Sequence, residues 1–154
     1  MVSEYPLGVF GPRRGVGASL KGTEKQRLIS DFINRRVWAV VGASKDRSKF
    51  GNRVYRSLRD AGYVVYPVNP SGGELEGAEV YPSLAHLPEL PEVIDLVVPP
   101  PVTEQVVVEA HELGLTRVWM QPGAESELAM TYCHDQDIQV VHHACAMVHK
   151  RRWD

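Results

Sequence analysis

The chain has 154 residues, of which 44% are hydrophobic and 23% are charged, and this length and composition indicate one globular domain rather than a disordered or fibrous protein. No stretch approaches the roughly 18 apolar residues of a membrane span and no signal-peptide core is found, so we expect a cytoplasmic protein without a membrane partner. The formal net charge is only -2, but the charges are distributed unevenly. Residues 1–60 contain 13 basic and 5 acidic residues, whereas residues 61–149 contain 1 basic and 13 acidic residues. This distribution favours binding of an anionic ligand near the first half of the chain.

The N-terminal segment, residues 1–22, is rich in glycine and has no sustained hydrophobic periodicity. We interpret it as an irregular or flexible extension, followed by a single domain over residues 23–154. Thr23 and Gln26 have the spacing of a capping box, and the apolar residues after them predict a first helix that ends near Asn34.

The next elements are a strand, a loop and a helix. Val37–Val41 is a continuous apolar run that is too short for an ordinary helix, and it is typical of a strand buried on both faces of a parallel sheet. From Gly51 onward Val54, Leu58 and Ala61 share one helical face, which predicts a helix.

Four more strands are predicted along the rest of the chain, with helical patterns between them. One of these helices is expected to be capped by Thr103, and another to cover residues 126–135. The alternation predicts an α/β fold, a Rossmann-like doubly wound and mainly parallel five-stranded sheet with helices on both faces. In such sheets the ligand lies at the carboxyl ends of the strands, where the strand order reverses. The four predicted strands are Tyr63–Val68, Ile94–Val98, Arg117–Met120 and Ile138–His142.

The loop between the first strand and its helix combines small residues, hydroxyls and cations at a helix start. Ser44 can donate hydrogen bonds, and Arg47 and Lys49 can neutralise phosphate oxygens beside amides that have no partner within the helix. The loop alone is also compatible with a tight turn whose cations are merely solvated. It departs from the dinucleotide fingerprint, because Ser44 replaces the second glycine and residues 61–73 contain no acidic ribose ligand. An ordinary NAD site is therefore disfavoured.

Seven segments between Arg36 and Trp153 carry a family resemblance. In chain order they are VVGAS, KFG, GYVVYPVNP, EGAEVYPSL, IDLVVPPP, VWMQPG and CAMVHKRRW. The chain resembles the stand-alone coenzyme A-binding proteins, whose Rossmann-like fold matches the N-terminal domain of the succinyl-CoA synthetase alpha subunit. The resemblance implies coenzyme A as the ligand, with Gly42, Ala43, Ser44, Lys49 and Gly51 lining its pyrophosphate, Asn69 and Pro70 approaching the adenosine, and Val98, Pro99 and Pro100 flanking the adenine.

The late part of the chain departs from this family. His143 and Ala144 precede Cys145 where the family usually has an Asp-Arg pair, which puts any role of that pair in doubt here. Cys145 and His149 are a single pair at helical spacing, and a small buried cysteine is favoured over a metal site. A mixed disulfide between Cys145 and the thiol of coenzyme A stays open as a third option. With only one other cysteine, Cys133, no disulfide framework is expected.

Three hypotheses follow for the function. The first is non-catalytic binding of coenzyme A or an acyl-CoA, without nucleic acid and with a protein partner left possible. No catalytic motif is found, and the synthetase reaction needs a further domain and a partner subunit, so we expect no enzyme activity of this chain alone. The second is an NAD(P)-binding oxidoreductase or redox-sensor domain, and the third is a structural protein whose basic half meets an acidic partner.

Overall fold

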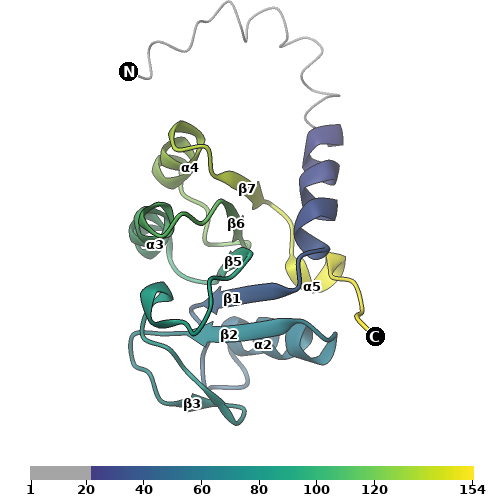
Figure 1. The fold of residues 1–154 in the computed structure, drawn as a ribbon, viewed down its shortest axis with the longest axis vertical. Helices are drawn as coiled ribbons and strands as arrows, with labels where there is room; N and C mark the ends of the chain where they lie inside the picture. Colours follow the sequence, from purple (N-terminus) through teal and green to yellow (C-terminus); the bar gives the residue numbers. More distant parts are fainter. Residues whose placement is uncertain (1–21) are drawn as a thin grey trace, which may run out of the picture.

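A computed structural model describes residues 22–154 of the protein, and its centre is a sheet of five parallel strands (Figure 1). The prediction of an irregular extension over residues 1–22 lies outside the described residues, except for Gly22, which is helical. The strand order across the sheet is β2-β1-β5-β6-β7. The strands are β1 (Val37–Val41), β2 (Val64–Val68), β5 (Val93–Leu96), β6 (Arg117–Met120) and β7 (Gln139–His142).

Helices cover both faces of this sheet, as Figure 1 shows. On one face lie a helix over residues 22–33, α2 (Phe50–Asp60) and the short α5 (Ala146–His149). On the other face lie α3 (Pro100–Glu112) and α4 (Glu127–Asp135), with the 3-10 turn η2 (Leu84–His86) beside α3. The Rossmann-like doubly wound fold expected from the sequence is confirmed.

The apolar run of β1 explains why it lies in the middle of the sheet. Trp38, Ala39 and Val40 are fully buried, and successive side chains enter the two separate cores on opposite faces. A strand with both faces covered has no solvent side and therefore needs no polar alternation.

The strand order fixes where a ligand is expected. The chain passes from β1 outward to β2 on one side and then crosses to β5 on the other side. This is a switch point of the doubly wound order, and a crevice forms at the carboxyl ends of the two diverging strands. Here the N–H of Gly42 donates to Val68 O and the N–H of Val97 donates to Val41 O, so the exits of β1, β2 and β5 lie together.

The structure differs from the sequence expectation at two helix starts. Thr103 does not cap α3, because the helix already begins at Pro100, where a proline is tolerated since the first helical N–H groups have no partner. Thr103 is buried instead, and its hydroxyl donates to Ala124 O at 2.8 Å. At the first helix, Gly22 is already helical, so Thr23 lies within the helix and not before it.

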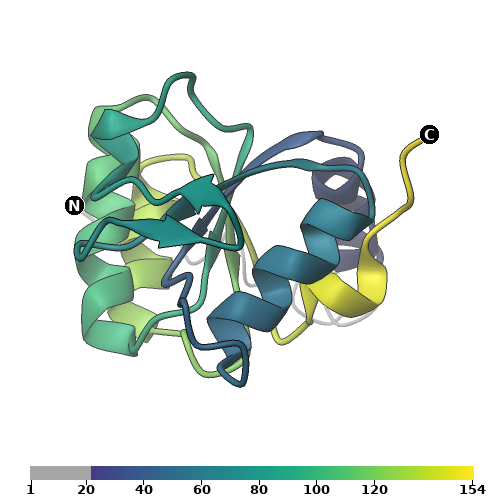
Figure 2. The same cartoon turned by 90° about the horizontal axis from the view of Figure 1, so that it is seen from below.

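An unpredicted hairpin lies after β2. It consists of β3 (Glu74–Leu75) and β4 (Ala78–Glu79), which pair in antiparallel fashion around Glu76 and Gly77. In Figure 2 the hairpin faces the viewer, with α2 on one side and the layer of α3 and α4 on the other. The hairpin therefore extends the molecule at the edge of the sheet that is formed by the carboxyl ends of β1 and β2.

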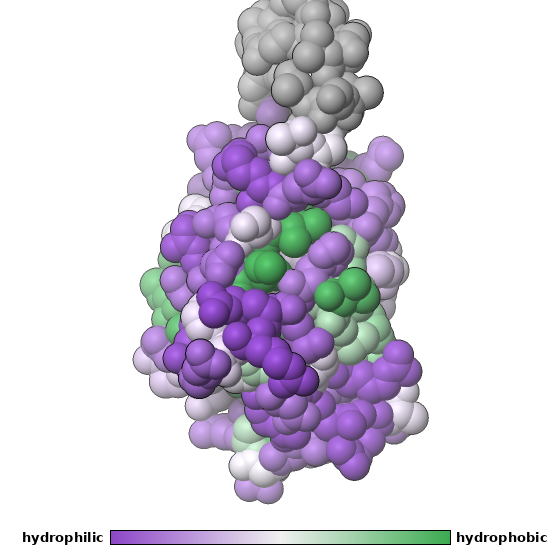
Figure 3. Space-filling model, turned by 90° about the vertical axis from the view of Figure 1, so that its right-hand side faces the viewer, coloured by the Kyte–Doolittle hydropathy of each residue, from purple (hydrophilic) through white to green (hydrophobic). Residues whose placement is uncertain are grey.

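The surface over the helix layer of residues 22–33, α5 and α2 is mostly hydrophilic, with a few separate hydrophobic spots (Figure 3). No helix within residues 22–154 is long and apolar enough to cross a membrane.

Candidate functional site

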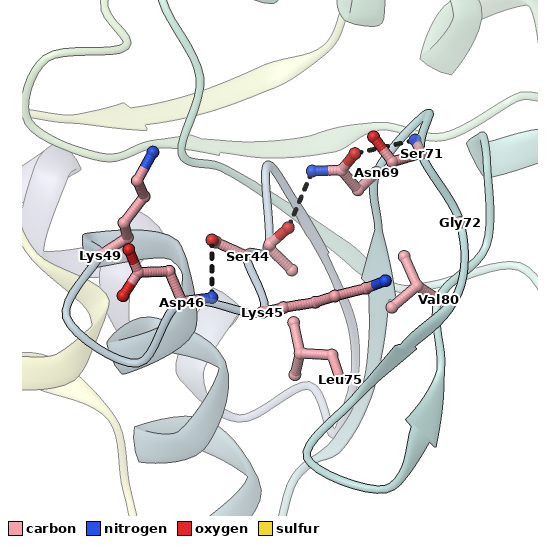
Figure 4. Close-up of a pocket in the computed structure, with 10 residues that line it drawn as sticks. Ser44, Lys45, Asp46, Lys49, Asn69, Ser71, Gly72, Leu75 and Val80 are labelled. Carbon is pink, nitrogen blue, oxygen red and sulfur yellow. Dashed lines mark hydrogen bonds between the residues drawn. The ribbon is translucent and has the colours of Figure 1, made fainter.

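A pocket of about 430 Å³ opens at the exits of β1 and β2 (Figure 4). One wall is the loop that follows β1, and the opposite wall comes from the turn after β2 and from the hairpin. The lining residues are Ala43, Ser44, Lys45, Asp46, Lys49, Asn69, Ser71, Gly72, Leu75 and Val80. Four of the predicted site residues, Ala43, Ser44, Lys49 and Asn69, are thus brought together here.

Side chains from outside hold the loop after β1 in shape. Asn69 donates through Nδ2 to Ala43 O at 2.9 Å, and Asn52, which is fully buried, donates through Nδ2 to Ser44 O at 2.8 Å. Arg56 donates through Nη2 to Arg47 O at 3.2 Å. Three points of the loop are therefore fixed by α2 and by Asn69, the residue directly after β2, so the loop is held in shape before any ligand arrives.

Within the loop, Asp46 organises a tight turn. The N–H of Asp46 donates to Ser44 Oγ, and Asp46 Oδ1 accepts from both the N–H and the hydroxyl of Ser48 at 2.9 and 2.7 Å. The hydrogen bonds from Ser48 lower the pKa of the Asp46 carboxyl, although it is exposed. The Asp46 carboxylate is thus occupied by hydrogen bonds within its own loop, and the Ser48 hydroxyl is used in the same turn.

Two lysines give the pocket its positive charge. Lys45 stretches across the opening toward the wall that carries Gly72 and Val80, as Figure 4 shows. A Cβ atom placed on Gly73 would lie only 2.5 Å from Lys45 Nζ, so a larger residue at Gly73 would displace the lysine. Lys49 lines the other side of the pocket as the N-cap residue of α2. The positive charge of the two ammonium groups, on different sides of the pocket, favours an anionic ligand.

The start of α2 adds unpaired amides. Asn52 and Arg53 donate through their N–H groups to Lys49 O, whereas those of Phe50 and Gly51 donate to no backbone carbonyl in residues 22–154. These groups carry the positive end of the helix dipole.

The two predicted glycines lie behind the loop and do not line the pocket. A Cβ atom on Gly42 would lie 2.1 Å from Val97 O, and one on Gly51 would lie 2.1 Å from Gly42 O. Gly42 also has a φ of +97°, which favours glycine. Both glycines therefore allow β1, β5 and α2 to approach one another closely.

The remaining predicted residues do not line this pocket. Val98 and Pro99 line a second hollow of about 300 Å³ at the exits of β5 and β6, together with Val97, Pro122, Gly123 and Ala124. Pro100 is the first residue of α3, and Pro70 is exposed next to Asn69. The side chain of Arg47 points to the hairpin, where its Nε lies 3.2 Å from Glu76 Oε2.

Sequence reasoning missed the hairpin side of the pocket. Leu75 and Val80 belong to a hairpin with two-residue strands, for which periodicity gives no signal. Ser71 and Gly72 form the turn after β2, and Ser71 is held there because its N–H donates to Asn69 Oδ1. Lys45 was part of the cationic loop, and only the structure shows that its side chain spans the opening.

The late cysteines and histidines form no metal site of the usual kind. Residues 22–154 contain no group of three or more His, Cys, Asp or Glu side chains that could hold a metal ion. Burial raises the pKa of the Cys133 thiol to about 12, so this thiol stays protonated at neutral pH. Cys145 is half-buried directly before α5, and His143 Nδ1 lies 3.6 Å from Glu125 Oε2.

Comparisons with known proteins agree with this geometry. Residues 36–151 match the family described as CoA binding domain. The alpha subunit of an ADP-forming acetate–CoA ligase II from Pyrococcus furiosus is 35% identical over 92 residues, which are 59% of this chain but only 20% of that subunit.

Two solved structures share the fold at higher coverage. A conserved hypothetical protein from Pyrococcus furiosus is 42% identical, with a TM-score of 0.71 over 73% of this chain and 97% of that chain. A hypothetical protein from Pyrococcus horikoshii is 31% identical, with a TM-score of 0.76 over 81% of this chain and 88% of that chain.

Proposed function

Because the chain belongs to the family of CoA binding domains, we propose that it binds coenzyme A or an acyl-CoA without itself catalysing a reaction. The observation that carries this proposal is the pocket at the switch point, with Lys45 and Lys49 on its walls and Asn69 and Ser71 beside them. Coenzyme A carries a diphosphate and a 3'-phosphate, and ammonium groups together with hydrogen-bond donors are what such groups require.

The two lysines suit different phosphates. Lys49 lies next to the unpaired amides at the start of α2, so we assign it, with Ala43 and Ser44, to the diphosphate. Lys45 reaches over to the turn after β2, so we assign it, with Asn69 and Pro70, to the adenosine end and its 3'-phosphate. Gly42 and Gly51 do not contact the ligand in this proposal, but they allow the close packing behind the loop. Arg47 acts indirectly, by holding the loop through its contact with Glu76.

The second hollow suits the flat adenine ring. Its walls include Val98 and Pro99, and Pro100 begins the helix beside it. Apolar side chains and rigid proline rings offer a flat base a surface without competing for its hydrogen bonds. We therefore propose that these three residues flank the adenine.

An oxidoreductase or redox sensor that binds NAD(P) is the alternative. It would need an acidic side chain at the end of the second strand for the ribose hydroxyls, whereas β2 is followed by Asn69. Asn69 is already engaged with Ala43 O and the N–H of Ser71. The geometry therefore favours coenzyme A over NAD.

Calorimetric titration of the protein with coenzyme A, dephospho-coenzyme A, NAD and NADP tests the proposal. We expect coenzyme A to bind at micromolar concentrations and more tightly than the other three ligands. Equal or tighter binding of NAD or NADP would support the alternative. Absence of binding by any of them would favour a structural role with an acidic protein partner.

Replacing Lys49 with alanine is expected to weaken coenzyme A binding about tenfold, because one charge-assisted contact to the diphosphate is lost. The dependence of the dissociation constant on salt should become flatter, since fewer charges are then screened. Titrations at several salt concentrations measure both effects. Lys150→Ala, directly after α5 and outside the lining of the pocket, is the matched control and should change neither quantity. Unchanged affinity of Lys49→Ala would remove Lys49 from the site.

Replacing Lys45 with alanine is expected to reduce the preference for coenzyme A over dephospho-coenzyme A to about a third or less of its wild-type value. The reason is that the two ligands differ only in the 3'-phosphate assigned to Lys45. The ratio of the two dissociation constants, measured by calorimetry, is the readout. If Lys45→Ala weakens the binding of both ligands equally, the lysine contacts a part of the molecule that both ligands share.

A further inference from the structure

The tip of the β3–β4 hairpin carries an acidic side chain that reaches the basic loop. Glu76 Oε2 lies 3.2 Å from Arg47 Nε and accepts a hydrogen bond from Asn52 Nδ2 at 3.3 Å. The side chain of Glu76 is only 17% exposed, although the residue stands at the turn of a surface hairpin. The carboxylate is therefore turned inward, between the loop and the start of α2.

The backbone at the tip is unusual for glutamate. Glu76 has a φ of +49° and Gly77 a φ of +82°, as a two-residue hairpin turn with both residues left-handed requires. Asparagine, aspartate or glycine is favoured at the first of these positions, and glutamate is strained there. Strain of this kind persists where surrounding contacts over-determine the conformation, and here the contacts are those to Arg47 and Asn52.

Asn52 connects this carboxylate to the rest of the loop. It is fully buried, its Nδ2 also donates to Ser44 O at 2.8 Å, and its Oδ1 accepts from Arg56 Nε at 2.6 Å. Arg56 in turn donates to Arg47 O. One network of hydrogen bonds thus joins the hairpin tip, the loop after β1 and the first turns of α2.

The hairpin that this network holds in place forms one wall of the proposed site. Leu75, directly before Glu76, is buried and lines the pocket, as does Val80 directly after β4. Lys45 points at the same wall. Any movement of the hairpin tip would therefore change the width of the pocket and the position of the lysine.

We propose that Glu76 is a positioning residue for coenzyme A: by holding Arg47 and Asn52 it fixes the hairpin wall against the phosphate-binding loop, and this slows the release of the bound nucleotide. The proposal rests on the proposed function and adds to it a residue that does not touch the ligand. It also gives Arg47 a different partner from the phosphate expected from the sequence.

Charge alone predicts the opposite effect of Glu76 on the release of coenzyme A. A carboxylate beside Arg47 offsets one of the cations of the loop, and if that were its main effect, its removal would tighten the binding of an anionic ligand. The two effects have opposite signs in the dissociation rate, so one experiment separates them.

The experiment measures association and dissociation rates of coenzyme A for the wild-type protein, Glu76→Ala, Arg47→Ala and the double variant. We expect coenzyme A to dissociate about five to ten times faster from each single variant, with little change in its association rate. From the double variant it should dissociate no faster than from either single variant, because both substitutions remove the same contact. Glu76→Asp should lie between the wild type and Glu76→Ala. Glu79→Ala, from an exposed residue of the same hairpin, is the matched control and should behave like the wild type.

Two further readouts make the role specific. The salt dependence of binding should stay the same in Glu76→Ala, in contrast to Lys49→Ala, because Glu76 contacts no phosphate. Amide hydrogen exchange over residues 74–80 should be faster in ligand-free Glu76→Ala than in the wild type.

Slower dissociation in Glu76→Ala would overturn the proposal in favour of simple charge competition. An unchanged dissociation rate would overturn it as well, while the wild type still binds coenzyme A and the proposed function stands. If the wild-type protein binds no coenzyme A, the proposed function fails first and this inference falls with it.

Discussion

The Asp95→Asn variant is expected to be more stable than the wild-type protein by a few kcal/mol at about pH 8.5, but by no more than about 1 kcal/mol at about pH 4.5. Asp95 lies on β5 and is fully buried. Its Oδ2 accepts a hydrogen bond from Gln121 Nε2 at 3.0 Å, while its Oδ1 has no hydrogen-bond partner within the described part of the chain. Gln121 Oε1 in turn accepts from the N–H of Ala146, where α5 begins.

The direction of the pH effect on stability follows from which state of the protein, folded or unfolded, holds the proton of Asp95. Burial raises the pKa of Asp95 to about 8, outweighing the hydrogen bond from Gln121, which lowers it. In the unfolded chain the carboxyl loses its proton near pH 4. Between these values the folded protein holds a proton that the unfolded chain has released, so stability falls with rising pH by at most about 1.4 kcal/mol per unit. Above the folded pKa this contribution stays lost.

Asparagine keeps the size of the side chain and an oxygen acceptor for Gln121, but it cannot ionise. The loss of stability with pH should therefore disappear in the variant. Urea unfolding at the two pH values measures it, with Asp154→Asn, from an exposed residue, as the control. A wild-type stability that does not fall between the two pH values would contradict the expectation.

Replacing Gly51 with alanine is expected to destabilise the protein by about 3 kcal/mol or more. The new Cβ would lie 2.1 Å from Gly42 O, 3.1 Å from Gly42 C and 3.3 Å from the Cα of Ala43. All three are backbone atoms next to β1, so the clash can be relieved only by moving α2 away from the sheet. On helix propensity alone the same change would stabilise by up to about 1 kcal/mol, so the two effects predict opposite signs.

Gly22→Ala is the matched control, because Gly22 is also helical and no atom of residues 22–154 lies within 4 Å of its added Cβ. Its stability should stay the same or rise slightly. Urea unfolding of both variants gives the comparison. If Gly51→Ala is as stable as Gly22→Ala, then α2 does not press against the loop after β1 in the way described.

Much of the fold could be predicted because its strands are buried on both faces. The run Val37–Val41 is β1, and Arg117–Met120 is β6 with the same ends, since neither stretch could be satisfied with one side in water. The Rossmann-like sheet and the helices on its faces follow from the alternation of such strands with helical patterns. The prediction that Thr103 caps a helix was wrong, because Pro100 and Pro101 form the first two positions of α3 and the helix therefore begins before Thr103.

The site could be predicted only on one wall. Ala43, Ser44 and Lys49 are close in sequence, and Asn69 directly follows a recognisable strand, so local patterns suffice for them. The opposite wall depends on a hairpin with two-residue strands, and such short strands are placed by tertiary contacts rather than by their own pattern. The roles of Glu76 and Asn52 depend on contacts across 24 residues of sequence, which no local rule indicates.

The central claim is that the lysine-lined pocket at the switch point holds the phosphates of coenzyme A. Titration of the isotope-labelled protein with coenzyme A, followed by the NMR shifts of its backbone amides, tests it most directly. The account predicts saturable shifts at Ser44, Lys45, Lys49, Ser71 and Gly72, with little change in α4 and β7. Shifts confined to another surface, or none with coenzyme A in large excess, would contradict it.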